Sequence, residues 1–186
     1  MQIQILSMLL NPIKTSYWIF IFIGGILFWA IFNLAYSQIN PDWYLVRDDG
    51  VITFSHARNL VEYGFIGINP SGERLEGYSA PLQFFIFLII YFIKPISFQS
   101  FTFWQTQICT VLLGCIFTSY FVEKPYFSIF ASLISASGLA LSKSFLEWHA
   151  SGMENAITHV LFATSVLILF FSARKKNIHL GLAWVL

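Results

Sequence analysis

The chain has 186 residues, of which 57% are hydrophobic, 19% aromatic and only 10% charged. Soluble domains carry roughly 25% charged residues, so the composition excludes a water-soluble globule, and its high hydrophobicity excludes an intrinsically disordered chain. The formal net charge is +1, which leaves no basic face for a nucleic-acid backbone. The sequence therefore predicts an all-α integral membrane protein.

The first predicted span covers residues 17–36, an uncharged apolar run of twenty residues. At 1.5 Å per residue, a helix of this length crosses a hydrocarbon core of about 30 Å. A cleaved signal peptide is the alternative, with Ala35-Tyr36-Ser37 as a weak match to a cleavage site. The run is longer than the usual apolar core of a signal peptide, which favours the span.

Five further apolar segments follow, over residues 80–93, 98–122, 126–142, 155–172 and 178–186. The segment 80–93 is short for a span, contains Pro81 and ends at Lys94-Pro95. We therefore expect it to be a hydrophobic helix that lies against the outer membrane face. The other four segments are predicted spans, and the last of them is incomplete.

This arrangement satisfies the positive-inside rule. The inner side receives five basic residues and one acid, namely Lys14, Glu123, Lys124, Arg174, Lys175 and Lys176. The outer side receives eight of the nine acids, namely Asp42, Asp48, Asp49, Glu62, Glu73, Glu76, Glu147 and Glu154. We expect a multi-pass plasma (inner) membrane protein with a cytoplasmic N-terminus, a long external loop over residues 37–97 and a short one over residues 143–154.

The long external loop contains two adjacent carboxylates, Asp48 and Asp49, followed by Gly50. Apolar residues then recur at spacings of three and four, at Val51, Phe54, Ala57, Leu60 and Val61. This spacing predicts a juxtamembrane helix over residues 50–63. Asp49 is expected to be its N-cap. Alternatively, the paired carboxylates form a general base or a cation site.

Polar side chains elsewhere in this loop are further candidates. Arg58 has the guanidinium fork that binds phosphate, although an interfacial arginine also reaches lipid headgroups. His56 is expected to be solvated rather than a ligand. Glu76 and Tyr78 place an acid and a phenol just before the surface helix over residues 80–93.

The short external loop ends at Glu154, immediately before the predicted span 155–172. An acid at a membrane edge is costly unless it is hydrated or paired, so Glu154 indicates a functional site. The alternative is a helix cap that complements the helix dipole. His149 is a second candidate in this loop. Four side chains inside apolar segments are expected to be packing residues or free thiols, namely His159, His179, Cys109 and Cys115.

The residues of both loops resemble the GT-C glycosyltransferases. The first loop does so at Asp48-Asp49-Gly50-Val51-Ile52-Thr53-Phe54, Ala57-Arg58-Asn59-Leu60, Asn69-Pro70, Gly72-Glu73-Arg74 and Glu76-Gly77-Tyr78-Ser79-Ala80-Pro81-Leu82. The second loop does so at Ser151-Gly152-Met153-Glu154, which is similar to the short acidic motif of this superfamily. The sequence is most similar to the bacterial arabinofuranosyltransferase-like branch, whose members use polyprenyl-phosphate sugars.

This resemblance implies a multi-span GT-C-like helical bundle that transfers a hexosyl or pentosyl group, with inversion, on the outer face of the membrane. The donor would be a polyprenyl-phosphate sugar, and the acceptor a cell-envelope glycan, lipid or protein. The implied roles are general base for Asp49 or Asp48, donor phosphate binding for Arg58, and acceptor or cation binding for Glu154, His149, Glu76 and Tyr78. A divalent cation, Mg²⁺ or Mn²⁺, would be held by Asp48 and Glu154.

Two departures from the family pattern and one alternative function accompany this prediction. Ser55 stands where related sequences often have a basic residue, and members of the family usually have more spans, so we expect an N-terminal fragment. The alternative is a non-enzymatic transporter or assembly subunit whose external acids bind a cation. Transporters usually bury ionisable residues at mid-membrane, whereas these acids gather outside the predicted spans.

Overall fold

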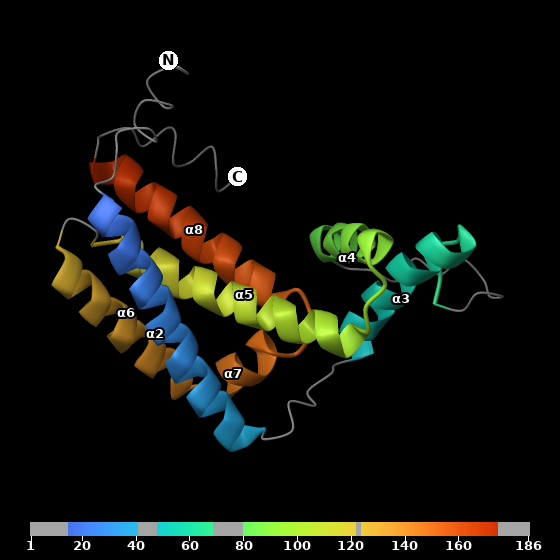
Figure 1. Ribbon diagram of the computed structural model, residues 1–186, viewed down its shortest axis with the longest axis horizontal. Coiled ribbons are helices and arrows are strands. Elements are labelled where there is room, and N and C mark those ends of the chain that lie inside the picture. The colour runs from blue at the N-terminus through green and yellow to red at the C-terminus, as the bar shows by residue number, and fades with distance from the viewer. Residues whose placement is uncertain (1–14, 41–47, 69–79, 122–123, 175–186) are drawn as a thin grey trace, which may run out of the picture.

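The structure is a computed structural model that describes residues 15–40, 48–68, 80–121 and 124–174. Its elements are α2 (Thr15–Ile39), α3 (Asp48–Tyr63), α4 (Pro81–Ile93), α5 (Phe98–Ser119), α6 (Pro125–Ala140), α7 (Lys143–His149) and α8 (Asn155–Arg174). The described residues contain helices and no strand, which confirms the predicted all-helical class there. Figure 1 shows α2, α5, α6 and α8 as a bundle, with α3 and α4 projecting beyond one end of it.

Two of these helices are long and apolar enough to cross a membrane, over Tyr17–Ile39 and Phe98–Ser119. A third span results if α6 and α7 are taken together, although a bend of 94° separates them. The predicted span 155–172 corresponds to a shorter apolar helix, and so does the segment 80–93. The predicted span 178–186 lies outside the described residues. These helices support a membrane protein.

α2 and α5 lie close together because small residues face one another. A Cβ atom added to Gly114 would lie 2.9 Å from the Cα atom of Gly25 and 2.5 Å from the Cβ atom of Phe28. A Cβ atom on Gly24 would overlap the side chain of Thr118. Glycines allow helix backbones to approach in this way inside a membrane, where close packing replaces hydrophobic association.

The C-terminal half of α2 packs against other parts of the chain. The helix continues without interruption through Ala35-Tyr36-Ser37, the segment considered as a cleavage site. Phe28, Phe32 and Tyr36 are at most 3% exposed. Because these large side chains are buried by other parts of the chain, the structure favours a retained helix over a removed signal peptide.

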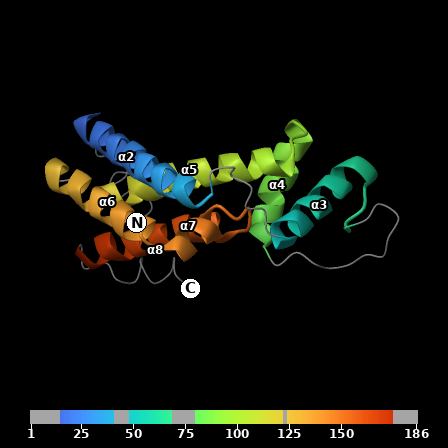
Figure 2. The same cartoon turned by 90° about the horizontal axis from the view of Figure 1, so that it is seen from below.

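α3 and α4 pack against each other and against the start of α5 (Figures 1 and 2). Their shared cluster consists of the buried residues Phe54, Ala57, Phe84, Phe87, Tyr91 and Phe101. Leu60 and Val61 pack at its edge, whereas Val51 is exposed. The predicted apolar stripe of α3 is therefore confirmed except at its first residue.

α4 is the predicted hydrophobic helix over residues 80–93, and Gln83 is the amide side chain in it. Pro81 occupies the start of the helix, where its missing N–H has no intrahelical partner to lose. One side is buried at Phe84 and Phe87, while the other exposes Phe92 and Ile93 by 76% and 77%. A helix that exposes large apolar side chains at this level is suited to contact with lipid.

Candidate functional site

The N-terminal turn of α3 lies against the loop that joins α7 to α8. A Cβ atom added to Gly50 would lie 2.5 Å from the Gly152 carbonyl oxygen and 3.0 Å from the ring of Phe98. Gly152 has a φ of +79°, in the left-handed region that favours glycine. We call this backbone approach the Gly50–Gly152 contact. It joins the two loops that the sequence predicts to be external.

Asp49 and Glu154 flank this contact. Asp49 is exposed and lies in the first turn of α3, which begins at Asp48, so Asp49 is inside the helix rather than at its N-cap. Glu154 is half-buried, and its carbonyl accepts from the Thr158 N–H at 2.9 Å, the bonding pattern of a residue that caps α8. Each carboxylate therefore stands at a helix N-terminus, where the helix dipole stabilises a negative charge.

Two buried glutamines, which the sequence analysis did not single out, hold the loop that carries Glu154. The Gln83 amide of α4 donates to the Gly152 carbonyl at 2.9 Å and to the Gln105 side-chain oxygen at 3.2 Å. The Gln105 amide of α5 donates to the Met153 carbonyl at 2.9 Å. Glutamines inside apolar segments were the available signal, because a buried amide is costly without partners.

Two oxygen atoms beside these bonds are buried without a partner among the described residues. They are the Gln83 Oε1 atom and the Thr102 Oγ1 atom. Thr102 lies next to the loop as well, since its hydroxyl would be 2.6 Å from a Cβ atom on Gly152. The polar network around the loop is therefore only partly satisfied, a condition that costs stability at each orphaned atom.

An apolar groove adjoins the same loop. It has a volume of about 420 Å³ and lies between α4, α5 and α8. The side chains that line it include Ile86 and Ile90 of α4, Trp104 and Ile108 of α5, and Ile157 and Leu161 of α8. Gln105 is the polar residue in the lining; the apolar part of its side chain lines the groove, while its buried amide holds Met153. The volume is within the range of small-molecule sites.

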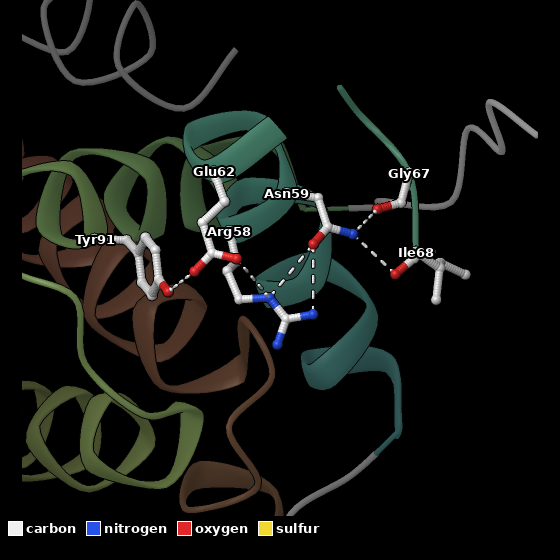
Figure 3. A network of polar contacts seen from close by, with 6 residues as sticks. All are labelled: Arg58, Asn59, Glu62, Gly67, Ile68 and Tyr91. Carbon is white, nitrogen blue, oxygen red and sulfur yellow. Dashed lines mark hydrogen bonds and ion pairs between the residues drawn. The ribbon is translucent and has the colours of Figure 1, made fainter. Parts of the chain in front are cut away.

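Arg58 is positioned away from the two carboxylates. Its Nε and Nη2 atoms each donate to the Asn59 side-chain oxygen at 3.4 Å, and its Nε atom lies 4.0 Å from Glu62. Glu62 also accepts from the Tyr91 hydroxyl of α4, which completes the network in Figure 3. Nine residues of α3 separate Arg58 from Asp49, or about 13.5 Å along the helix axis. The structure does not bring the predicted phosphate ligand to the predicted base.

Asn59, the neighbour of Arg58, has a structural role. It is fully buried, and its amide donates to the carbonyls of Gly67 at 2.7 Å and Ile68 at 2.9 Å. These bonds fold the segment after α3 back onto the helix (Figure 3). The helix itself stops at Gly64, whose φ of +66° suits a C-terminal glycine.

His56 is not solvated, so that expectation is wrong. It is fully buried, and its Nδ1 atom lies 2.7 Å from the Ile52 carbonyl one turn earlier. Thr53 and Ser55 are also buried. The side of α3 that looks polar in the sequence is thus covered by protein at Thr53, Ser55 and His56, and Thr53 and His56 bond to backbone carbonyls one turn earlier.

His149 is 1% exposed and faces the interior of the bundle rather than the groove loop. Its Nε2 atom is 3.1 Å from the Thr110 hydroxyl, and its Nδ1 atom is 3.0 Å from Nδ1 of His159. The Thr110 hydroxyl donates to the Thr106 carbonyl at 2.7 Å, so it accepts from His149. His159 must then donate to His149. Both ring nitrogens of His149 therefore have a partner inside the bundle, and neither is left to bind an acceptor or a cation.

The ring of His149 is neutral. Burial, with the neighbouring His159 as a smaller cause, lowers the pKa of His149 to about 3. α7 lies outside the predicted spans, yet its histidine is enclosed by Phe32 and Phe145. A neutral ring fits the tautomer described above, in which Nδ1 of His149 accepts a hydrogen bond from the Nδ1–H of His159.

The remaining candidates lie outside the described part of the chain. Glu76 and Tyr78 fall in the stretch 69–79, and the side chain of Asp48 is likewise outside it. Among the residues described, no group of three or more His, Cys, Asp and Glu side chains could hold a metal ion. Cys109 and Cys115 are free thiols, as predicted. The divalent cation stays a prediction.

Comparison with known proteins found no family model, no curated protein and no solved structure that matches the chain. The resemblance to GT-C glycosyltransferases therefore rests on the loop residues quoted above. Three geometric features bear on function. They are the contact between the loops, the carboxylates that flank it and the adjoining groove.

Proposed function

We propose that this chain is a membrane glycosyltransferase of the GT-C type that transfers a sugar from a polyprenyl-phosphate donor to a cell-envelope acceptor. The observation that carries the proposal is the Gly50–Gly152 contact, because it joins the turn bearing Asp49 to the loop bearing Glu154. The apolar groove opens beside the same loop. An apolar groove that is connected through Gln105 to the loop of a carboxylate suits a reaction between a lipid-linked donor and a polar acceptor.

In the proposed reaction, the acceptor hydroxyl attacks the anomeric carbon of the sugar from the side opposite the phosphate. A bond forms between the acceptor oxygen and the anomeric carbon, while the bond from that carbon to the phosphate oxygen breaks. The configuration inverts, and polyprenyl phosphate leaves with the bonding electrons. The exposed carboxylate of Asp49 takes the proton of the acceptor hydroxyl as general base, with Asp48 as the alternative.

The hydrocarbon tail of the donor would occupy the apolar groove. The part of the lining on α5 extends from Phe101 to Leu112, and eleven residues of helix measure about 16.5 Å along the axis. An elongated apolar surface of this length suits a chain better than a compact ring. Because Gln105 lies within this stretch, the groove reaches the loop of Glu154, which would bind the acceptor.

Arg58 can serve the phosphate only after leaving its present partners. Its pair with Glu62 joins side chains that are 39% and 36% exposed, at a distance of 4.0 Å. Exposed pairs of this i,i+4 type stabilise a helix by only about 0.3–0.5 kcal/mol. Releasing Arg58 therefore costs little, and the departing polyprenyl phosphate, which gains a second negative charge as the bond to the sugar breaks, would form a stronger, two-pronged contact with the guanidinium.

The direct test is sugar transfer from a panel of polyprenyl-phosphate hexoses and pentoses by the full chain in membranes, with release of polyprenyl phosphate measured by mass spectrometry. We expect release from at least one donor. Asp49→Asn should lower turnover by about 10²-fold or more, while Asp48→Asn has a milder effect. Glu147→Gln is the matched control, because Glu147 is paired with Lys143 on α7.

Two results would contradict the proposal. The first is the absence of release from every donor in the panel. The second is near-full turnover in both Asp49→Asn and Asp48→Asn. If the acids instead bound a cation without releasing polyprenyl phosphate, the transporter alternative would be favoured.

A further inference from the structure

Gln105 belongs to two features of the molecule at once. Its side chain lines the apolar groove, and its amide donates to the backbone carbonyl of Met153, one residue before Glu154. Its side-chain oxygen in turn accepts from Gln83. A group that enters the groove therefore meets the residue that holds the loop.

Gln83 extends this connection to the other carboxylate. Its amide donates to the Gly152 carbonyl, the same oxygen that approaches Gly50 in the Gly50–Gly152 contact. Gly50 follows Asp49 directly in α3. A continuous path of bonds and contacts thus leads from the groove through two side chains to the backbone beside both acids.

The two glutamines are buried, and their hydrogen-bond network is incomplete. Gln83 is 1% exposed and Gln105 is 7% exposed. The Gln83 Oε1 atom and the neighbouring Thr102 hydroxyl have no partner among the described residues. A fully satisfied network specifies one arrangement, whereas an orphaned oxygen gains a hydrogen-bond partner if the network rearranges. Contact with an occupant of the groove can select among such arrangements.

We propose that Gln105 and Gln83 are positioning residues that couple the occupant of the apolar groove to the loop bearing Glu154. The inference rests on the proposed function for the nature of that occupant, a long hydrocarbon chain attached to a phosphate. A chain in the groove packs against the apolar part of the Gln105 side chain and thereby restricts its amide, which holds Met153. Gln83, which is bonded to Gln105, holds the Gly152 carbonyl in turn, and that carbonyl contacts Gly50. The acceptor site is then aligned only when the donor chain is seated.

The test uses the full chain in detergent with both native cysteines replaced by alanine and a spin label on Met153→Cys. Gln105 bonds to the backbone carbonyl of Met153, so this substitution leaves the bond in place. The probe is hexadecyl phosphate with bromine atoms on its chain. Its binding is measured by quenching of Trp104, which lines the groove, as the difference from Trp104→Phe. The label reports the mobility of the loop.

In the unmodified network, we expect quenching of Trp104 and a fall in label mobility over the same range of probe concentration. In Gln105→Met, which fills a similar volume without an amide donor, quenching should stay within about twofold while the label response is lost. Gln83→Met should give the same loss. Gln107→Met is the matched control, because Gln107 is also buried on α5 but accepts from Trp29 of α2. Its label response should persist.

The outcomes separate this inference from the proposed function. Quenching without any change in label mobility, or a full label response in Gln105→Met, would overturn the coupling. Absence of quenching would overturn the hydrocarbon groove and the coupling together. Quenching and coupling in a chain that releases no polyprenyl phosphate from any donor would overturn the glycosyltransferase proposal alone.

Discussion

Replacing Gly50 by alanine tests the contact on which the candidate site depends. The added Cβ atom would lie 2.5 Å from the Gly152 carbonyl oxygen. To reach ordinary van der Waals contact at 3.4 Å, α3 and the loop have to separate by about 0.9 Å. The Gly152 backbone cannot simply rotate away, since Gln83 holds the same carbonyl.

The expected size of the effect follows from two opposing contributions. Alanine stabilises a helix relative to glycine by up to about 1 kcal/mol. Overpacking a close contact costs about 1–3 kcal/mol, so after the full helix gain a net loss of about 0–2 kcal/mol remains. For a chain of this length, each kcal/mol lowers the melting temperature by about 2–4 °C. A displacement near 1 Å at reacting groups also lowers turnover by about 10²-fold.

The assay is thermal unfolding in detergent, recorded together with sugar transfer, for Gly50→Ala and for the control Gly138→Ala. A Cβ atom on Gly138 in α6 meets nothing within 4 Å, so the control should melt at the same temperature or higher. Gly50→Ala should melt up to about 8 °C lower and lose activity. If both variants melt alike and Gly50→Ala keeps its turnover, the close approach of the two loops is refuted.

Three further predictions follow from the same residues. Glu154→Gln should keep the melting temperature within about 2 °C and lower the rate of sugar transfer. A loss of stability of about 1 kcal/mol with unchanged turnover would mean that Glu154 is only a helix cap. In a cysteine-free chain, Tyr63→Cys and Ser144→Cys, both at exposed positions, should react with an impermeant thiol reagent from outside; protection of Ser144→Cys alone would mean that α4 crosses the membrane. The pKa of His149 is about 3 in the folded chain against an ordinary 6.5, so its contribution to stability is complete above pH 6.5 and falls by up to about 1.4 kcal/mol per pH unit below it. His149→Gln should flatten this acid dependence between pH 6.5 and 5, and an unchanged slope would contradict the assignment.

Helical periodicity was sufficient to predict the elements that pack locally. The spacing of Phe54, Ala57 and Leu60 predicted which side of α3 is apolar, and proline together with a short apolar run predicted α4. The burial of His56 was not predictable in this way, because it depends on what covers the second side of the helix. His56 is buried by other parts of the chain. The residues next to it in the sequence do not indicate that burial.

The candidate site was predictable only in part. Two acidic loops on one side of the membrane suggested a shared site, and the Gly50–Gly152 contact agrees with that idea. The i,i+4 spacing of Arg58 and Glu62 on the predicted helix already favoured their pairing, whereas the sequence could not reveal that His149 turns into the bundle toward His159. That orientation depends on which side chains are nearest in three dimensions, and here the partner lies on the next helix.

The glycine packing between α2 and α5 also affects how the chain is assembled during synthesis. Gly114 follows Gly25 by 89 residues, and a ribosome adding 5–20 residues per second needs roughly 4–18 s to make that length. During this interval α2 lacks α5 as a packing partner, and the indole N–H of Trp29 lacks its acceptor on Gln107. Until α5 is made, the indole N–H of Trp29 therefore needs a hydrogen-bond partner other than Gln107.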